Sequence, residues 1–83
     1  MARTAQPDPI LAEVLRRFRE NKGLTREAAA FHSGVTVGSI ARIELGESAP
    51  AFATVRTIAR ALGVTLVELA VALEAAEGTP DAT

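Results

Sequence analysis

The sequence contains no cysteine, tryptophan or tyrosine, and only one histidine among its 83 residues. The lack of cysteine excludes disulfide bonds, thiolate zinc sites and cysteine nucleophiles. One histidine, with no carboxylates paired at a recognisable spacing, leaves little material for catalysis. We therefore expect no enzymatic activity, no cofactor and no metal site. His32 is interpreted as a surface or capping residue near a helix end.

Long hydrophobic runs are also missing. The amino-terminal stretch MARTAQPDP has no apolar signal-peptide core, and no apolar run approaches the roughly 18 residues of a membrane helix. We therefore expect a soluble, cytoplasmic protein without a membrane partner. What is abundant is leucine, isoleucine, valine and alanine, with hydrophobic residues at 48% and few aromatics, which favours compact helices over a β-sandwich. A chain of this length forms at most one domain with a modest core, so dimerisation would help it.

The net charge of −1 hides an uneven distribution. Residues 1–60 hold nine basic and six acidic side chains, whereas residues 61–83 hold four acidic and no basic ones. A basic front and an acidic back would orient the domain on a polyanion such as DNA. The alternative, that a surface this mixed is merely solvated, stays open.

Start and stop signals divide the chain into helices. Asp8 and Pro9 are typical of an N-cap and first helical position, and Thr65 with Glu68 forms a capping-box pattern. The expected helices lie at roughly residues 8–32 with a short break, 37–45, 52–62 and 66–77. They fall in one domain, residues 8–77, between a flexible arm, residues 1–7, and a disordered tail, residues 78–83.

The stretch LTREAAAFHSGVTVGSIARIELG, residues 24–46, has the pattern of two helices crossing at a tight turn. Thr25 and Thr36 are expected N-caps, because a threonine hydroxyl can accept from an amide of the first turn. Gly34 lies between them, where a sharp helix end needs a residue that can adopt a positive φ. This is the helix-turn-helix pattern, whose second helix can enter the DNA major groove.

Further motifs surround this stretch at characteristic spacings. They are Gly23-Leu24-Thr25, Ser33-Gly34-Val35-Thr36, Ile40 with Ile43-Glu44 and Gly46, and Ile58-Ala59 with Ala61-Leu62. Over about residues 10–73 the combination resembles the phage-repressor and Cro-like helix-turn-helix regulators, the XRE-type family. The resemblance implies an all-α fold, a compact five-helix bundle of the lambda-repressor-like type. It also implies a bacterial or phage-encoded transcriptional regulator, a repressor, that reads double-stranded DNA as a homodimer.

The resemblance also points to residues that would contact DNA. Arg42 would pair with a guanine base edge, worth roughly 1–3 kcal/mol of discrimination, although a phosphate contact or a surface ion pair stays open. Further phosphate contacts are considered for Arg3, Arg16 and Arg17. The expected DNA-binding set is Thr25, Arg26, Thr36, Val37, Gly38, Ser39 and Arg42.

In this family the arginine of the first helix pairs with the glutamate that ends the recognition helix. The corresponding residues are Arg19 and Glu44, which would form a partly buried ion pair. Three positions depart from the family pattern. Ala29 replaces a core leucine, so that site is either underfilled or filled by another side chain. Phe31 replaces a polar residue, and we expect it to pack onto a neighbouring side chain, the alternative being that it is exposed for a partner. Glu47 would repel phosphate if it faced the duplex.

The last expected helix carries a second apolar set, Val67 and Val71, away from its main stripe. We interpret these valines as a dimer seam, the alternative being that the core of one chain uses both sets. A second functional hypothesis is an antitoxin or phage-type accessory protein that binds a protein partner. A third is an interaction module that has lost DNA binding, which Val37-Gly38 and Glu47 would favour.

Overall fold

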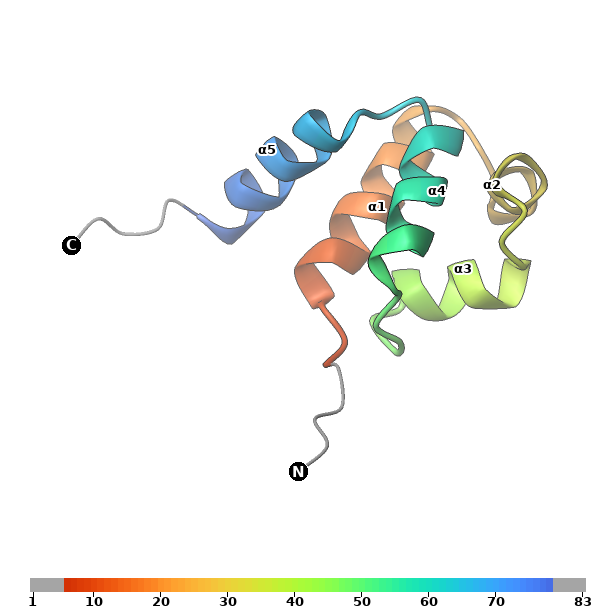
Figure 1. Cartoon of the computed structure of the whole chain (residues 1–83), viewed down its shortest axis with the longest axis horizontal. Helices are drawn as coiled ribbons and strands as arrows, with labels where there is room; N and C mark the ends of the chain where they lie inside the picture. Colours follow the sequence, from red (N-terminus) through yellow and green to blue (C-terminus); the bar gives the residue numbers. More distant parts are fainter. Residues whose placement is uncertain (1–5, 79–83) are drawn as a thin grey trace.

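The computed structural model describes residues 6–78, and within them it contains helices and no strand (Figure 1). The all-α prediction is confirmed, and the break expected inside residues 8–32 falls between the first two helices. No helix in this described part is long and apolar enough to cross a bilayer. The five helices are α1 (Pro9–Asn21), α2 (Arg26–Ser33), α3 (Val37–Glu44), α4 (Phe52–Ala61) and α5 (Leu66–Glu77).

Most of the helices begin at a side-chain cap that the sequence predicts. The Asp8 carboxylate accepts from the first amides of α1, and the Thr25 and Thr36 hydroxyls accept from amides of α2 and α3. At α5 the capping box is complete, because Thr65 accepts from the Glu68 amide while the Glu68 carboxylate accepts from the Thr65 amide. Each cap satisfies an amide that the helix itself leaves unpaired.

Gly34 ends α2 and makes the turn into α3. Its φ of 76° lies in the left-handed region, and its N–H donates to the Ala30 carbonyl at 2.8 Å. A side chain at this position would be strained, so glycine sets where the two helices cross.

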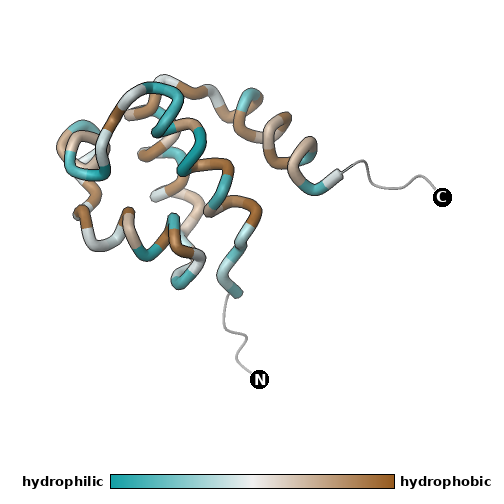
Figure 2. The backbone as a smooth tube through the Cα atoms, turned by 180° about the vertical axis from the view of Figure 1, so that it is seen from behind, coloured by the Kyte–Doolittle hydropathy of each residue, from teal (hydrophilic) through white to brown (hydrophobic). Residues whose placement is uncertain are grey.

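The core lies among α1, α3 and α4, with α2 and α5 packed at its sides. Hydrophobic and hydrophilic residues alternate along the helices (Figure 2), and a subset of the hydrophobic ones packs into one core cluster. Ala29 is only 1% exposed, so neighbouring helices enclose this small side chain. The buried residues that form the core cluster are Val14, Leu15, Ala29, Ile40, Ile43, Val55, Ile58, Ala59, Leu62, Val64 and Leu69.

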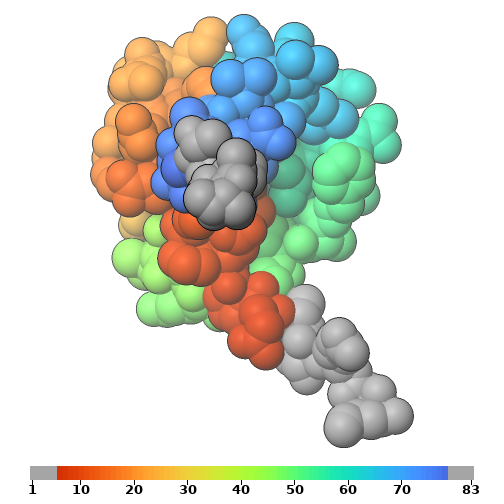
Figure 3. Space-filling view, turned by 90° about the vertical axis from the view of Figure 1, so that its left-hand side faces the viewer, coloured from red at the N-terminus to blue at the C-terminus, as the bar shows by residue number. Residues whose placement is uncertain are grey.

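The last helix, α5, is the least embedded of the five. It contacts α1 and α4, and Figure 3 shows its surface between theirs. Leu69 is its one buried residue, while Val67 and Val71 are 73% and 61% exposed. The core of a single chain therefore does not use both apolar sets of this helix.

Candidate nucleic-acid interface

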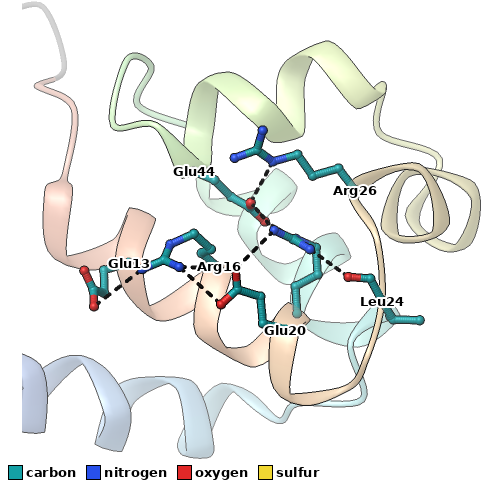
Figure 4. A network of polar contacts seen from close by, with 7 residues as sticks. Glu13, Arg16, Glu20, Leu24, Arg26 and Glu44 are labelled. Atoms are coloured by element: carbon teal, nitrogen blue, oxygen red, sulfur yellow. Dashed lines mark hydrogen bonds and ion pairs between the residues drawn. The ribbon is translucent and has the colours of Figure 1, made fainter.

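A buried carboxylate, that of Glu44, ties the end of α3 to α1 and α2 (Figure 4). Arg19 on α1 donates through Nε to Glu44 Oε2 at 2.7 Å and through Nη2 to Oε1 at 2.9 Å. Arg26, the first residue of α2, donates through Nε to Glu44 Oε1 at 3.0 Å. The remaining Nη1 of Arg19 donates to the Leu24 carbonyl at 2.7 Å. These bonds fix the orientation of α3 against the two helices before it.

The positive charges of Arg19 and Arg26 favour the ionised form of the Glu44 carboxylate. Burial is the largest single influence on Glu44 and opposes its ionisation, but the hydrogen bonds from Arg19 and Arg26 outweigh it together and lower the pKa of Glu44. The bond to Glu44 likewise raises the pKa of Arg19 above its usual value, against the opposing effect of burial. The cluster thus stays fully charged at neutral pH, with two guanidinium groups around one buried carboxylate.

The start of α3 forms an exposed polar row. The Thr36 hydroxyl accepts from the Ser39 amide at 3.1 Å and donates to Ser39 Oγ at 2.9 Å, and Arg42 Nη2 donates to the same Oγ at 3.4 Å. An added Cβ at Gly38 would lie 3.6 Å from Arg42 Nη1, so this guanidinium lies along the helix surface beside the glycine. Val37, the first residue of α3, is 38% exposed.

The structure therefore joins Thr36, Ser39 and Arg42 in a row along α3, from its N-cap to its last turn, with Gly38 beside Arg42 and Val37 at the first position of the helix. Thr25 and Arg26 lie at the start of α2, where Thr25 uses its hydroxyl as a cap.

The sequence interpretation missed the contact between Arg26 and Glu44. It considered Arg26 only as a DNA-binding residue, yet its Nε is bound inside the fold while its Nη groups carry no bond in the described part of the chain. The sequence held part of the signal for this contact, since Arg19 lies near the end of α1 and Arg26 is the first residue of α2. Their common acceptor, however, is far along the chain.

The structure also shows the surroundings of Phe31 and Arg16. Phe31 is 84% exposed and makes an edge contact with the His32 ring, so the expected packing is wrong. It lies about 200° around α2 from buried Ala29, which turns it to solvent. Arg16 is held by exposed ion pairs to Glu13 and Glu20 at 3.7 and 3.2 Å.

The remaining positions considered in the sequence are either exposed or outside the described residues. Arg17 and Glu47 are exposed, and His32 is exposed in the last turn of α2. Arg3 lies outside the described residues. Within residues 6–78 no three potential metal-ligating side chains gather.

Two short helices joined at a glycine turn, the second presenting an exposed polar start and fixed by a buried carboxylate, define a helix-turn-helix domain. Residues 15–69 match the helix-turn-helix family HTH_3, and the chain belongs to this family, the XRE type indicated by the sequence motifs.

Solved structures show the same relationship. An HTH_3 family transcriptional regulator from Vibrio cholerae is 33% identical with a TM-score of 0.71, over 81% of this chain and 35% of that one. The restriction-modification controller protein C.AhdI from Aeromonas hydrophila is 30% identical with a TM-score of 0.70, over 74% of this chain and 92% of that one.

A third similar structure shares the fold at lower identity. It is the restriction-modification controller protein C.Esp1396I, a tetramer in complex with its natural 35 base-pair operator. That chain is 24% identical with a TM-score of 0.80, over 82% of this chain and 90% of that one. No curated protein sequence matches the chain.

Proposed function

We propose that this protein is a sequence-specific DNA-binding transcriptional regulator, acting as a repressor, that reads the major groove with α3. The observation that supports this most is the row of Thr36, Ser39 and Arg42 along α3, a helix held in place by the buried Glu44 cluster. Fixed orientation matters because a recognition helix must present the same donors to every base pair it reads. The DNA-binding domain comprises residues 8–77.

Within this proposal the row on α3 reads bases. Arg42 donates to guanine O6 and N7, Ser39 reaches a base edge or a phosphate, and Val37 contacts a thymine methyl group. Gly38 leaves the helix surface low enough for the backbone to approach the duplex closely.

The start of α2 binds the phosphate backbone. Its free amides and helix dipole favour an anion there, next to the Thr25 cap. Arg26 adds a cation whose Nε is already held by Glu44, so its Nη groups are presented without further ordering. These contacts position the protein and carry no sequence information.

The protein acts as a homodimer through Val67 and Val71. These exposed valines are four residues apart on α5 and face away from the core. A single domain reads only a few base pairs, whereas two domains one helical turn apart gain useful specificity.

Selection from a random duplex library at low salt tests the proposal. We expect a palindromic site with half-sites one helical turn apart, bound with an affinity that falls steeply as salt rises. No enrichment at low salt would contradict DNA binding.

Phe31 favours a second candidate function. An aromatic ring that is 84% exposed on α2 offers an apolar anchor for a protein partner, as an antitoxin or phage-type accessory protein would need. If the chain is a pure interaction module, the same selection enriches no duplex at any salt concentration.

A further inference from the structure

The side chain of Arg42 starts from the last turn of α3 and reaches back toward the first turn. Its Nη2 donates to Ser39 Oγ at 3.4 Å, and its Nη1 lies 3.6 Å from the position of a Cβ on Gly38. Side chains of an α-helix point toward its amino-terminal end, and four residues span about 6 Å along the axis. The guanidinium therefore lies about one turn before its own Cα, nearer the end of α3 that would enter the major groove.

Gly38 provides the space for this path. Its φ is not positive, so the backbone of α3 does not require a glycine at this position. Glycine also destabilises a helix relative to alanine, so the missing side chain has a local cost. The nearest atom to an added Cβ is Nη1 of Arg42, and a longer side chain would compete with the guanidinium for the same space.

Ser39 provides the acceptor for the guanidinium, and Thr36 holds that acceptor in place. The Thr36 hydroxyl donates to Ser39 Oγ at 2.9 Å and accepts from the Ser39 amide at 3.1 Å. A hydroxyl oxygen accepts two hydrogen bonds, so Ser39 Oγ can serve Thr36 and Arg42 together. Its own hydroxyl hydrogen remains available for a base edge or a phosphate.

No carboxylate competes with Ser39 for this arginine, since Arg42 makes no ion pair within residues 6–78. In water a hydrogen bond between exposed side chains contributes little, but a duplex that covers α3 would exclude water and strengthen the bond. An arginine that is already bent over the start of the helix also loses less freedom on binding than one that samples all its rotamers.

We propose that Ser39 is a positioning residue for Arg42, which it holds bent over Gly38 so that the remaining guanidinium N–H groups face a guanine edge. This inference rests on the base reading by Arg42 in the proposed function and adds what selects the conformation of that side chain. It requires Ser39 and Arg42 to determine the preference at the same base pair.

A double-mutant cycle on the duplex selected with the wild-type chain tests the inference. Dissociation constants for that duplex and its single-base variants are measured by fluorescence anisotropy of labelled DNA. We expect Ser39→Ala to lower the preference at the base pair read by Arg42 by about threefold to tenfold, because the guanidinium loses its preferred orientation. In the Arg42→Ala background, Ser39→Ala should have no further effect on that preference.

Three further variants complete the experiment. Ser39→Thr keeps the hydroxyl and should retain the preference, whereas Gly38→Leu fills the space under the guanidinium and should lower it. Ser48→Ala is the matched control, since it removes a hydroxyl from the loop after α3 and should leave every base preference unchanged. Circular dichroism verifies that each variant is folded.

The remaining outcomes separate the possible failures. If Ser39→Ala changes the preference at another base pair, or still acts when residue 42 is alanine, Ser39 reads DNA by itself and the inference is wrong. A Gly38→Leu variant with the wild-type preference would contradict the placement of the guanidinium over Gly38. An unchanged preference in Ser39→Ala would overturn the inference and leave DNA binding in place, whereas a wild-type chain that selects no duplex would overturn both.

Discussion

Glu44 is the residue on which the orientation of α3 depends most. Its side chain is 4% exposed and accepts from two arginines on two other helices. A buried carboxylate with this many donors is stable only while both sides of the ion pair remain, since removal of one partner leaves the other charge uncompensated.

This dependence predicts a pH-sensitive stability. The pKa of Glu44 is lowered in the folded state, so its stabilisation is fully present above the unfolded pKa of about 4.3 and is lost as pH falls through the lower folded value. We expect Glu44→Gln to lower the free energy of unfolding by about 3 kcal/mol at pH 7 and to flatten its decline between about pH 5 and 2. Urea denaturation at a series of pH values measures both effects.

Glu20→Gln is the control for this measurement. Its side chain is 50% exposed, and exposed ion pairs contribute only about 0–1 kcal/mol. Equal losses from the two variants would contradict the structural role assigned to the Glu44 cluster.

The two arginines that we propose to contact DNA, Arg42 and Arg26, are expected to act differently. Arg42→Ala should relax the preference at one base pair of each half-site, because a bidentate base contact is lost, at roughly 1–3 kcal/mol. Arg26→Ala should weaken all duplexes alike and reduce the salt dependence of binding, because a phosphate contact is lost. Affinities for a selected site and its single-base variants, measured at several salt concentrations, distinguish the roles. Equal, sequence-independent losses from both variants would contradict base reading by Arg42.

The sequence predicts one residue-level contact of this cluster and not the other. The pairing of Arg19 with Glu44 follows from a family pattern, which records contacts between distant positions. Arg26 has no part in that pairing, so its bond to Glu44 depends on how α2 and α3 cross, and only the folded chain contains that information. The exposure of Phe31 was missed for a related reason, since it follows from which face of α2 the core covers.

At the scale of elements, the ends of helices are the features that the sequence specifies best. Caps and glycine turns act within a few residues, so their chemistry is readable before any tertiary contact is known. The start of α4 is the exception, because Ala51, which follows Pro50 in an extended conformation, provides no side-chain cap.

Two glycines separated by four positions should respond oppositely to alanine. Gly34 has a φ of 76°, so Gly34→Ala should lower the free energy of unfolding by about 1–2 kcal/mol. Gly38 lies in α3, and the nearest atom to an added Cβ is at 3.6 Å, so Gly38→Ala should raise stability by about 0.5–1 kcal/mol. Urea denaturation of both variants checks this contrast. A destabilised Gly38→Ala would show that the first turn of α3 does not tolerate a side chain.

At the scale of the whole molecule, acidic and basic residues are separated between elements. The last helix carries acidic side chains and no basic ones, whereas α4 carries arginines and no acidic ones. The uneven distribution was readable from the sequence, but it predicted only an orientation on DNA.

The exposed valines of α5 give the prediction that links assembly to DNA binding. Val71→Asp places a charge in the apolar stripe, so we expect a monomer by sedimentation and a lower affinity for a palindromic site, with a smaller salt dependence because one half-site is lost. Phe31→Asp is the matched control, since it replaces an even more exposed hydrophobic residue on α2 and should leave the dimer intact. An unchanged dimer in Val71→Asp would place the seam elsewhere. A monomer that still binds the whole palindrome at wild-type affinity would mean that the two domains act independently on DNA.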